Sequence, residues 1–242
     1  MRTLEEIDRE VFGAGKEPGE QQSVEWLMAR VGHVTASRFK DVMDRLKNGT
    51  PGAKRTAYLW EVVIERITQS PVQHYESTAM SHGIEHEPRA RMATEARTGA
   101  IVMETGFLHH PSVSMVGGSP DGLIDDDGGI EIKCPFNSAH HLACWLSGMP
   151  TEHVAQVQGL MWITGRAWWN FVSYDPRLPE PLDLFVQRIP RDEDYITRLA
   201  NEVEVFLGEV AELLDKLNAR SGTGNSAGIS VLPLSDAAAG TQ

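Results

Sequence analysis

Residues 117–135, GGSPDGLIDDDGGIEIKCP, predict a β-hairpin, and the rest of the chain can be interpreted around it. A short apolar run at residues 122–124 is followed by the turn-rich residues 125–129. Residues 130–133 then alternate apolar and charged side chains. Apolar runs separated by Asp and Gly are typical of a strand, a turn and a second strand.

The charged side chains of this hairpin are expected to gather on one face. Glu131 and Lys133 are two residues apart, so on a strand they project together, while Ile130 and Ile132 project from the opposite face. If the hairpin closes over its turn, Asp121 comes level with Glu131. Two carboxylates and one ammonium group then converge.

Such a cluster predicts chemistry at a metal ion. Hard carboxylate oxygens suit Mg²⁺ or Mn²⁺ better than zinc, and a lysine beside the metal can hold or deprotonate an attacking water. Metal-dependent phosphodiester hydrolysis uses this combination. The alternative is a surface hairpin with an exposed Glu/Lys ladder. Pro120-Asp121 and Glu131-Ile132-Lys133 at hairpin spacing favour the catalytic interpretation.

The pairing of Pro120-Asp121 with Glu131-x-Lys133 is similar to the PD-(D/E)XK nuclease motif. The extended form comprises SPDG (119–122), EIKCPF (131–136) and AQVQ (155–158). In this form the sequence resembles the phage lambda exonuclease family, the YqaJ-type viral recombinases, over residues 26–195. The resemblance implies an α/β fold with a restriction-endonuclease-like core, in which a mixed central sheet is flanked by helices.

The resemblance also implies a full catalytic set. Aligning HGIEHEPRAR with the family pattern places Glu87, and not Glu85, at the position of the third acidic ligand. The implied metal ligands are Glu87, Asp121, Glu131 and the carbonyl of Ile132, and the catalytic residues are Asp121, Glu131, Lys133, Glu87 and Gln156. They would hold two Mg²⁺ ions ~3.5–4 Å apart, with Mn²⁺ as a substitute. Gln156 on its own would be interpreted as a solvated surface residue.

Further residues are expected to contact DNA. The amides of a helix beginning after Thr35, with Arg30 and Ser37, make a phosphate site, and the family places an Arg and a Ser there. The resemblance adds Ser119 as a phosphate contact, Met80 as an apolar wedge between base pairs, and His153 in place of a family tyrosine. The alternatives are a surface role for Arg30 and a core role for Met80.

One position departs from the family pattern. Lambda-type enzymes carry an arginine shortly after the motif lysine that grips the terminal 5′-phosphate, and Ala139 stands at that position. Either His140 or His141 substitutes in a weak, pH-dependent way, or the preference for a 5′-phosphate end is relaxed. A separate alternative, zinc binding by His82 and His86 at i, i+4 spacing, lacks a third ligand.

The overall composition indicates one domain. The chain of 242 residues divides into an N-terminal arm (1–22), a single exonuclease domain (23–220) and a tail expected to be disordered (221–242). No apolar run has membrane-spanning length and no signal peptide is evident, so we expect a cytoplasmic protein, in the bacterial host cytoplasm if phage-encoded. The two cysteines are expected to be free thiols.

The net charge of −12 argues against coating nucleic acid by bulk electrostatics. Residues 37–56 are locally basic, however, and could face DNA while the last helix carries much of the acidic excess. The basic side chains of this stretch are Arg38, Lys40, Arg45, Lys47, Lys54 and Arg55. The alternative is a solvated helix face followed by a loop.

Periodicity and capping residues predict the elements. Helices are expected at 23–30, 35–47, 54–69, 80–98, 138–146, 152–164 and from 192 onward. Strands are expected at 101–107, 112–117, 122–124, 130–133, 167–174 and 182–189. In the last helix we expect an inward stripe of Ile196, Leu199, Val203, Phe206, Val210, Leu213 and Leu217.

The sequence therefore predicts a metal-dependent 5′→3′ exonuclease that degrades one strand of linear double-stranded DNA and leaves 3′ single-stranded overhangs for phage-type recombination. The resemblance further implies double-stranded DNA ends as substrate, a homotrimeric ring and a single-strand annealing protein as partner. The alternatives are a nuclease or nickase of the same fold that cuts DNA internally, and a catalytically silent DNA-binding assembly module.

Overall fold

The computed structural model describes residues 21–72 and 77–221. The helical elements are α2 (Val24–Arg30), η1 (Ala36–Arg38), α3 (Phe39–Val42), α4 (Ala53–Thr68), α5 (Thr78–Thr98), α6 (Ser138–Ser147), η2 (Thr151–His153), α7 (Val154–Thr164) and α8 (Glu193–Ser221). The strands are β1 (Val34–Thr35), β2 (Val102–Met103), β3 (Leu108–His109), β4 (Val116–Gly118), β5 (Gly122–Ile124), β6 (Gly128–Lys133), β7 (Trp168–Tyr174) and β8 (Leu184–Pro190).

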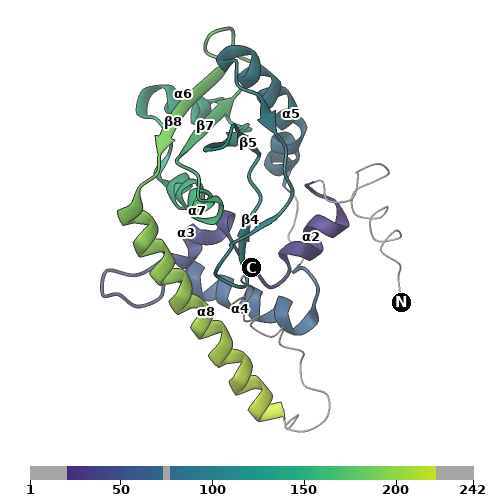
Figure 1. Cartoon of the computed structure of the whole chain (residues 1–242), viewed down its shortest axis with the longest axis vertical. Helices are drawn as coiled ribbons and strands as arrows, with labels where there is room; N and C mark the ends of the chain where they lie inside the picture. Colours follow the sequence, from purple (N-terminus) through teal and green to yellow (C-terminus); the bar gives the residue numbers. More distant parts are fainter. Residues whose placement is uncertain (1–20, 73–76, 222–242) are drawn as a thin grey trace, which may run out of the picture.

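The strands form two sheets. The larger has the order β2-β5-β6-β7-β8, in which β6 and β7 are parallel and the other neighbours are antiparallel. The smaller has the order β1-β4-β3, with β1 parallel to β4. Helices pack around both sheets (Figure 1). The expected mixed α/β fold with helices flanking a mixed sheet is confirmed.

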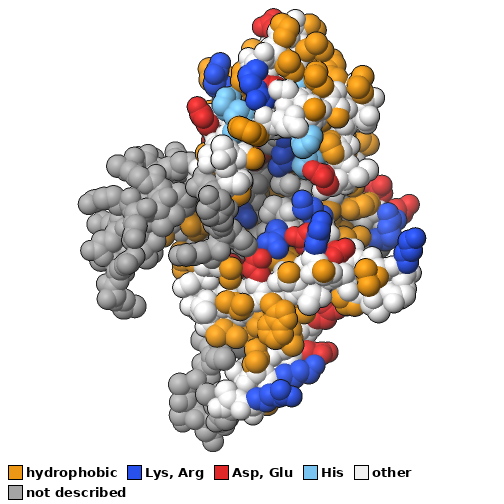
Figure 2. Space-filling view, turned by 180° about the vertical axis from the view of Figure 1, so that it is seen from behind, with side chains coloured by type: hydrophobic (Ala, Val, Ile, Leu, Met, Phe, Trp, Pro, Cys, Tyr) orange, Lys and Arg blue, Asp and Glu red, His pale blue; other side chains and the backbone are white. Residues whose placement is uncertain are grey.

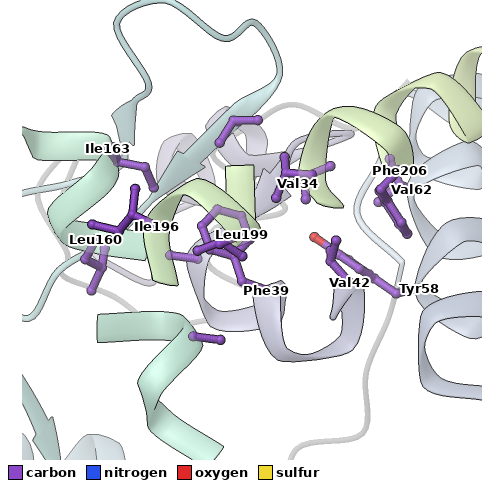
Figure 3. Packing of buried hydrophobic residues seen from close by; sticks show 14 of the residues in the cluster. Val34, Phe39, Val42, Tyr58, Val62, Leu160, Ile163, Ile196, Leu199 and Phe206 are labelled. Atoms are coloured by element: carbon purple, nitrogen blue, oxygen red, sulfur yellow. The ribbon is translucent and has the colours of Figure 1, made fainter. Parts of the chain in front are cut away.

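The residues of β6 and β7 face two different cores, because side chains alternate along a strand. Ile130, Ile132 and Val172 pack with Ala90 of α5 on one side of the larger sheet. Trp169 belongs to the other core, to which η1, α3, α4, α7 and α8 contribute. Figure 3 shows residues of α3, α4, α7 and α8 meeting in this second core.

The last described helix, α8, packs against α3, α4 and α7. Asp192 caps it by accepting a hydrogen bond from the backbone N–H of Tyr195 at 2.9 Å. Its buried side chains are Ile196, Leu199, Val203, Phe206, Val210 and Leu214. The predicted stripe is therefore confirmed as far as Val210, beyond which Leu214 takes the buried position expected for Leu213. The distal part of α8 extends away from the larger sheet (Figure 1).

The arginines of the basic stretch at residues 37–56 form ion pairs within the protein. Arg38 pairs with Asp41 and Glu61. Arg45 pairs with Glu202 of α8, and the fully buried Arg55 pairs with Glu202 and Glu209 of the same helix. The three arginines thus neutralise acidic side chains. The buried Arg55 cannot belong to a basic surface, whereas Arg38 and Arg45 are partly exposed and Lys40, Lys47 and Lys54 are exposed. That this stretch faces DNA stays a prediction.

Several predicted boundaries also need correction. The helix expected at 35–47 is a 3₁₀ turn followed by α3, and it ends at Val42. The strands expected at 101–107 and 112–117 shrink to β2 and β4, and β3 lies in the connection between them, where no strand was expected. The other expected helices and strands are present within a few residues of their predicted bounds.

Several large apolar side chains of α4 and α5 are exposed. Ile67 of α4, and Ile84 and Met92 of α5, lie on the surface. On α4, Trp60 and Ile64 are exposed as well, on the side turned away from the buried Tyr58 and Val62. Figure 2 shows that hydrophobic side chains gather in patches on one face of the molecule.

In the part of the chain that the structure describes, none of the helices combines the length and the apolar character needed to cross a membrane. The predicted N-terminal arm (1–22) and tail (221–242) lie outside the described residues except for residues 21, 22 and 221.

Candidate active site

The hairpin of β5 and β6 has the predicted geometry. Gly122 pairs with Ile130 and Ile124 with Gly128 in an antiparallel register, so Asp121 lies level with Glu131. The backbone N–H of Ile132 donates to Asp121 Oδ2 at 2.6 Å. The register, which a tight turn of fixed length imposes, therefore brings the two motif carboxylates together.

Glycine is required at the base of β6. A Cβ atom at Gly129 would lie 2.3 Å from the Trp169 indole of the parallel neighbour β7. At Gly128 it would lie 2.1 Å from the Trp168 indole. The Gly-Gly step thus lets the two indoles pack directly over the strand that carries the motif.

Glu131 is fully buried, and only one of its two carboxylate oxygens has a hydrogen-bond partner among the described residues. Its Oε1 oxygen accepts a hydrogen bond from Lys133 Nζ. Its Oε2 oxygen is buried and has no hydrogen-bond partner among the described residues. Leaving a buried carboxylate oxygen without a donor is costly, so this oxygen is suited to receive a cation or a donor from a ligand.

Glu87 reaches the same region from α5. The charges of Asp121 and Lys133 both act on Glu87, whereas Glu85 is exposed. Glu87 Oε1 accepts from Arg91 Nη2 at 2.9 Å, and Arg91 Nη1 also contacts Glu104 Oε1 at 2.7 Å. The choice of Glu87 over Glu85 from the sequence thus agrees with its position.

The three carboxylates share an environment that disfavours their charged forms. Burial, reinforced by the charge of Asp121, raises the pKa of Glu131 to about 8 and that of Glu87 to about 7. Burial also raises the pKa of Asp121, while the charge of Lys133 opposes the shift. Burial on its own would lower the pKa of Lys133, but the carboxylates outweigh it and hold that pKa above the ordinary value.

The donor set fits a divalent cation. Three carboxylates with raised pKa values and one orphaned buried oxygen make a cluster that a hard cation would stabilise. Within the described ranges, the His, Cys, Asp and Glu side chains form no cluster of three already arranged around a metal position. Glu131 is turned toward Lys133 and Glu87 toward Arg91. The ligand role of the Ile132 carbonyl stays a prediction.

A second group of predicted residues meets beside β4. Ser119 Oγ accepts from Arg30 Nη1 at 3.3 Å and from Trp26 Nε1 at 2.8 Å. The Arg30 guanidinium stacks over the Trp26 ring, 4.2 Å from its centroid. Trp26 was not among the residues predicted to lie at the site. The signal was its position one helical turn before Arg30.

Ser37, the third predicted phosphate contact, is exposed at the start of η1. Its hydroxyl lies 3.3 Å from Thr35 Oγ1. No contact joins it to Arg30 or Ser119 among the residues described. The structure therefore brings together Arg30 and Ser119 but leaves Ser37 separate.

His153 lies over the site face of the sheet. Its ring stacks on Phe171 with centroids 5.3 Å apart, and Phe171 is the register partner of Glu131. Burial, followed by the charges of Lys133 and Lys40, lowers the pKa of His153 to about 4. A neutral imidazole therefore stands close to Lys133.

Gln156 and Met80 are less constrained. Gln156 is half-buried and makes no hydrogen bond within the described ranges, whereas Gln158 is buried and binds the carbonyl of Pro190 and the N–H of Asp192. The side chain of Met80 is 51% exposed. The core alternative for Met80 is therefore wrong, while its wedge role stays a prediction.

Near Ala139 only one of the two candidate histidines is accessible. His141 is fully buried, and its ring nitrogens contact Ser173 Oγ at 2.8 Å and the Leu182 carbonyl at 2.7 Å. His140 is exposed. If a histidine substitutes for the family arginine, it is His140.

Arg177 and the pair of His82 and His86 also lie near this region. Arg177, which sequence reasoning missed, donates to the carbonyls of Pro135 and Phe136 from the turn after β7. His82 and His86 stack with centroids 4.1 Å apart, and His86 Nδ1 contacts the His82 carbonyl. No third ligand joins them in the described chain, so the zinc alternative gains no support.

Asp121, immediately before β5, thus lies beside Glu131 and Lys133 of β6 in a mixed sheet flanked by helices. The chain belongs to the family of the YqaJ-like viral recombinase domain, whose model matches residues 25–167.

Solved structures and a curated relative agree with this assignment. A crystal structure of LHK-Exo in complex with dAMP shares 42% identity and a TM-score of 0.76, covering 82% of this chain and 97% of that chain. LHK-Exo is an alkaline exonuclease from Laribacter hongkongensis. A phage-related exonuclease from Haemophilus somnus 129PT shares the fold, with 14% identity and a TM-score of 0.62 over 76% of this chain and 96% of its own. The Escherichia coli K12 protein ExoD is 35% identical over 68 residues, which are 28% of this chain and 76% of ExoD.

Proposed function

We propose that this protein is a metal-dependent exonuclease that degrades one strand of linear double-stranded DNA in the 5′→3′ direction. The observation that carries the proposal is the buried cluster of Asp121, Glu131 and Lys133, which leaves Glu131 Oε2 without a partner among the described residues. Two similarities support it: 42% identity to an exonuclease crystallised with dAMP, and membership of a viral recombinase family. A restriction-endonuclease-like core is part of the proposal.

We assign the divalent cations, Mg²⁺ with Mn²⁺ as a substitute, to the carboxylates of Glu87, Asp121 and Glu131 and the carbonyl of Ile132. When bound, such cations activate water and stabilise the leaving oxygen in phosphodiester hydrolysis. Each carboxylate of this set has one oxygen held by the protein, through Arg91, the Ile132 N–H or Lys133. The other oxygen of each is left for the metals.

The roles of the other residues follow from their positions. The surrounding carboxylates keep Lys133 protonated, so we assign it to hydrogen-bond the attacking water and the charge that develops on the phosphoryl group. Arg30 and Ser119 lie together beside β4 and would hold a neighbouring phosphate of the strand. His153 stacks on Phe171 and would contact the substrate as a neutral ring.

The proposal extends to products and assembly. Removal of one strand from a 5′ end leaves a 3′ single-stranded overhang, the substrate of a single-strand annealing protein, which we propose as partner. A homotrimeric ring around DNA would allow many nucleotides to be removed in one encounter. The exposed Trp60, Ile64 and Ile67 of α4 support contacts with another protein surface.

A time course on linear duplexes tests the function. Each duplex carries a fluorescent label on one strand and either a 5′-phosphate or a 5′-hydroxyl end, and digestion is started with Mg²⁺. We expect mononucleotides to be released from the 5′ ends, and the 3′-terminal parts of the strands to persist as single-stranded overhangs. Similar rates on both ends would show that Ala139 relaxes the preference for a 5′-phosphate.

Covalently closed circular DNA of the same sequence is the control for an internal cutter. We expect it to remain intact, because an exonuclease needs an end. Nicking or linearisation of the circle would favour the alternative of a PD-(D/E)XK endonuclease. Binding of both substrates without any hydrolysis would favour the catalytically silent module.

A further inference from the structure

The carboxylates of the site are each held by a single donor through a single oxygen. Asp121 is held by the N–H of Ile132, and Glu131 by Lys133. Both of these donors belong to β6, so the hairpin register fixes them. Glu87 comes from α5 and needs a different means of orientation.

Arg91 supplies that means from one helical turn further along α5. Its Nη2 donates to Glu87 Oε1 at 2.9 Å, and its Nη1 contacts Glu104 Oε1 at 2.7 Å. The Arg91 side chain is only 11% exposed, whereas Glu104 is 72% exposed. The guanidinium thus bridges α5 to the segment that follows β2, and its planar fork fixes the direction in which Glu87 points.

Held in this way, Glu87 presents one free oxygen. Oε1 is bound to Arg91, and Oε2 makes no hydrogen bond among the described residues. The Arg91 Nε nitrogen is buried and has no partner in the described chain. The polar contacts of the guanidinium in this part of the chain are therefore those with Glu87 and Glu104. If Arg91 competed with the cation for Glu87, it would bind both carboxylate oxygens. It binds only Oε1, so Oε2 is available to a cation.

We propose that Arg91, anchored by Glu104, is a positioning residue that orients Glu87 for divalent-cation binding. This inference rests on the proposed function, because it takes Glu87 as a metal ligand. Residues that orient ligands in this manner typically change metal affinity by ~10–100-fold when they are replaced. Arg91 acts through Glu87 and has no direct part in the reaction.

Direct titration with Mn²⁺, followed by the paramagnetic resonance of the free ion and without DNA, tests the proposal. Arg91→Gln is expected to weaken Mn²⁺ binding by ~10–100-fold, and Arg91→Lys to restore little, since an ammonium cannot span both carboxylates. Glu104→Gln keeps Arg91 but removes its anchor, so a loss below ~10-fold is expected. Thermal unfolding of each variant checks that it is folded at the temperature of the titration.

The matched control is Arg97→Gln. Arg97 lies on the same helix and pairs with Asp183 at 3.2 Å, away from the hairpin. It should bind Mn²⁺ as the wild type does. Mn²⁺ binding by Arg91→Gln that is equal to or tighter than wild type would overturn the proposal, because it would make Arg91 a bystander or a competitor. If Arg91→Gln does not fold, Arg91→Lys and Glu104→Gln decide by the same criterion.

Activity at rising Mn²⁺ concentration separates positioning from a structural role. A loss of affinity is corrected at saturating metal, so Arg91→Gln should then approach the wild-type rate of DNA digestion. A rate that stays low at saturation would contradict the proposal. Failure of the wild-type protein itself to bind Mn²⁺ and digest DNA would instead defeat the proposed function, which keeps the two outcomes distinct.

Discussion

The molecule buries charged side chains in two regions, which differ in whether the charge is compensated by neighbouring residues. Between α4 and α8 the fully buried Arg55 donates to the Val42 carbonyl and to the carboxylates of Glu202 and Glu209, so its positive charge is compensated. In the β5–β6 hairpin, carboxylates outnumber the ammonium of Lys133, and Glu131 Oε2 has no partner in the described chain.

The difference separates the roles of the two regions. A buried ion network with every charge compensated can hold a fold together without a ligand. A buried cluster with excess negative charge disfavours the folded state until a cation joins it, and such imbalance is a mark of functional sites. Changes in the first region should therefore alter stability, and changes in the second should alter catalysis and metal binding.

The largest effect is expected for Lys133→Ala. Loss of the ammonium removes the donor to the attacking water, so the rate of DNA digestion should fall by ~10²–10⁴-fold. Binding of a labelled duplex in Ca²⁺ should be retained, because Arg30 and Ser119 are untouched. Rates from single-turnover digestion and affinities from fluorescence anisotropy give the two numbers, and an unchanged turnover would contradict the assigned role.

Arg55→Leu should have the opposite profile. It removes a fully buried cation from its partners, which should lower the free energy of unfolding by about 3 kcal/mol. The folded fraction should keep its catalytic rate. Urea denaturation followed by tryptophan fluorescence measures the loss.

Arg45→Ala is the control, since Arg45 pairs with the same Glu202 from a partly exposed position. Its replacement should cost at most about 1 kcal/mol. An equal loss of stability in both variants would remove the distinction between a buried network and a surface pair.

The pH should change both the stability of the fold and the metal affinity of the site. The folded-state pKa values of Glu87 and Glu131 are raised from 4.5 to about 7 and about 8, so folding favours their protonated forms. The cation-free protein should therefore lose stability as the pH rises from about 5 toward 8. Mn²⁺ affinity should increase by at least ~10-fold between pH ~6 and pH ~8, because binding releases these protons. A flat profile in isothermal titration calorimetry would contradict the raised pKa values.

The hairpin could be predicted from the sequence because its information is local. Alternation along residues 130–133 sets the faces of β6, and the Asp/Gly turn sets the register that brings Asp121 beside Glu131. Most helices were predicted for the same reason, through capping by residues such as Ser23 and Asp192, whereas the helix expected at 35–47 was not confirmed in that form.

Contacts between distant residues could not be predicted in this way. Arg55 and Glu202 are 147 residues apart, so no spacing rule connects them, and a stretch of basic residues was interpreted as a DNA-facing surface. The same limit applies to the burial of His141 against Leu182. Arg91 lies one turn from Glu87, but its second contact with Glu104 depends on how α5 packs against the chain after β2.

We propose that the hairpin carboxylates bind the divalent cation that hydrolysis requires. Glu131→Gln keeps the shape of the side chain but replaces the charged carboxylate by a neutral amide, which is a poor ligand for a divalent cation. The oxygen that has no hydrogen-bond partner, Oε2, belongs to this carboxylate. Calorimetric titration of Mn²⁺ into the wild type and this variant should show binding in the first and its loss in the second, together with loss of DNA digestion. Wild-type Mn²⁺ affinity in Glu131→Gln would contradict the account.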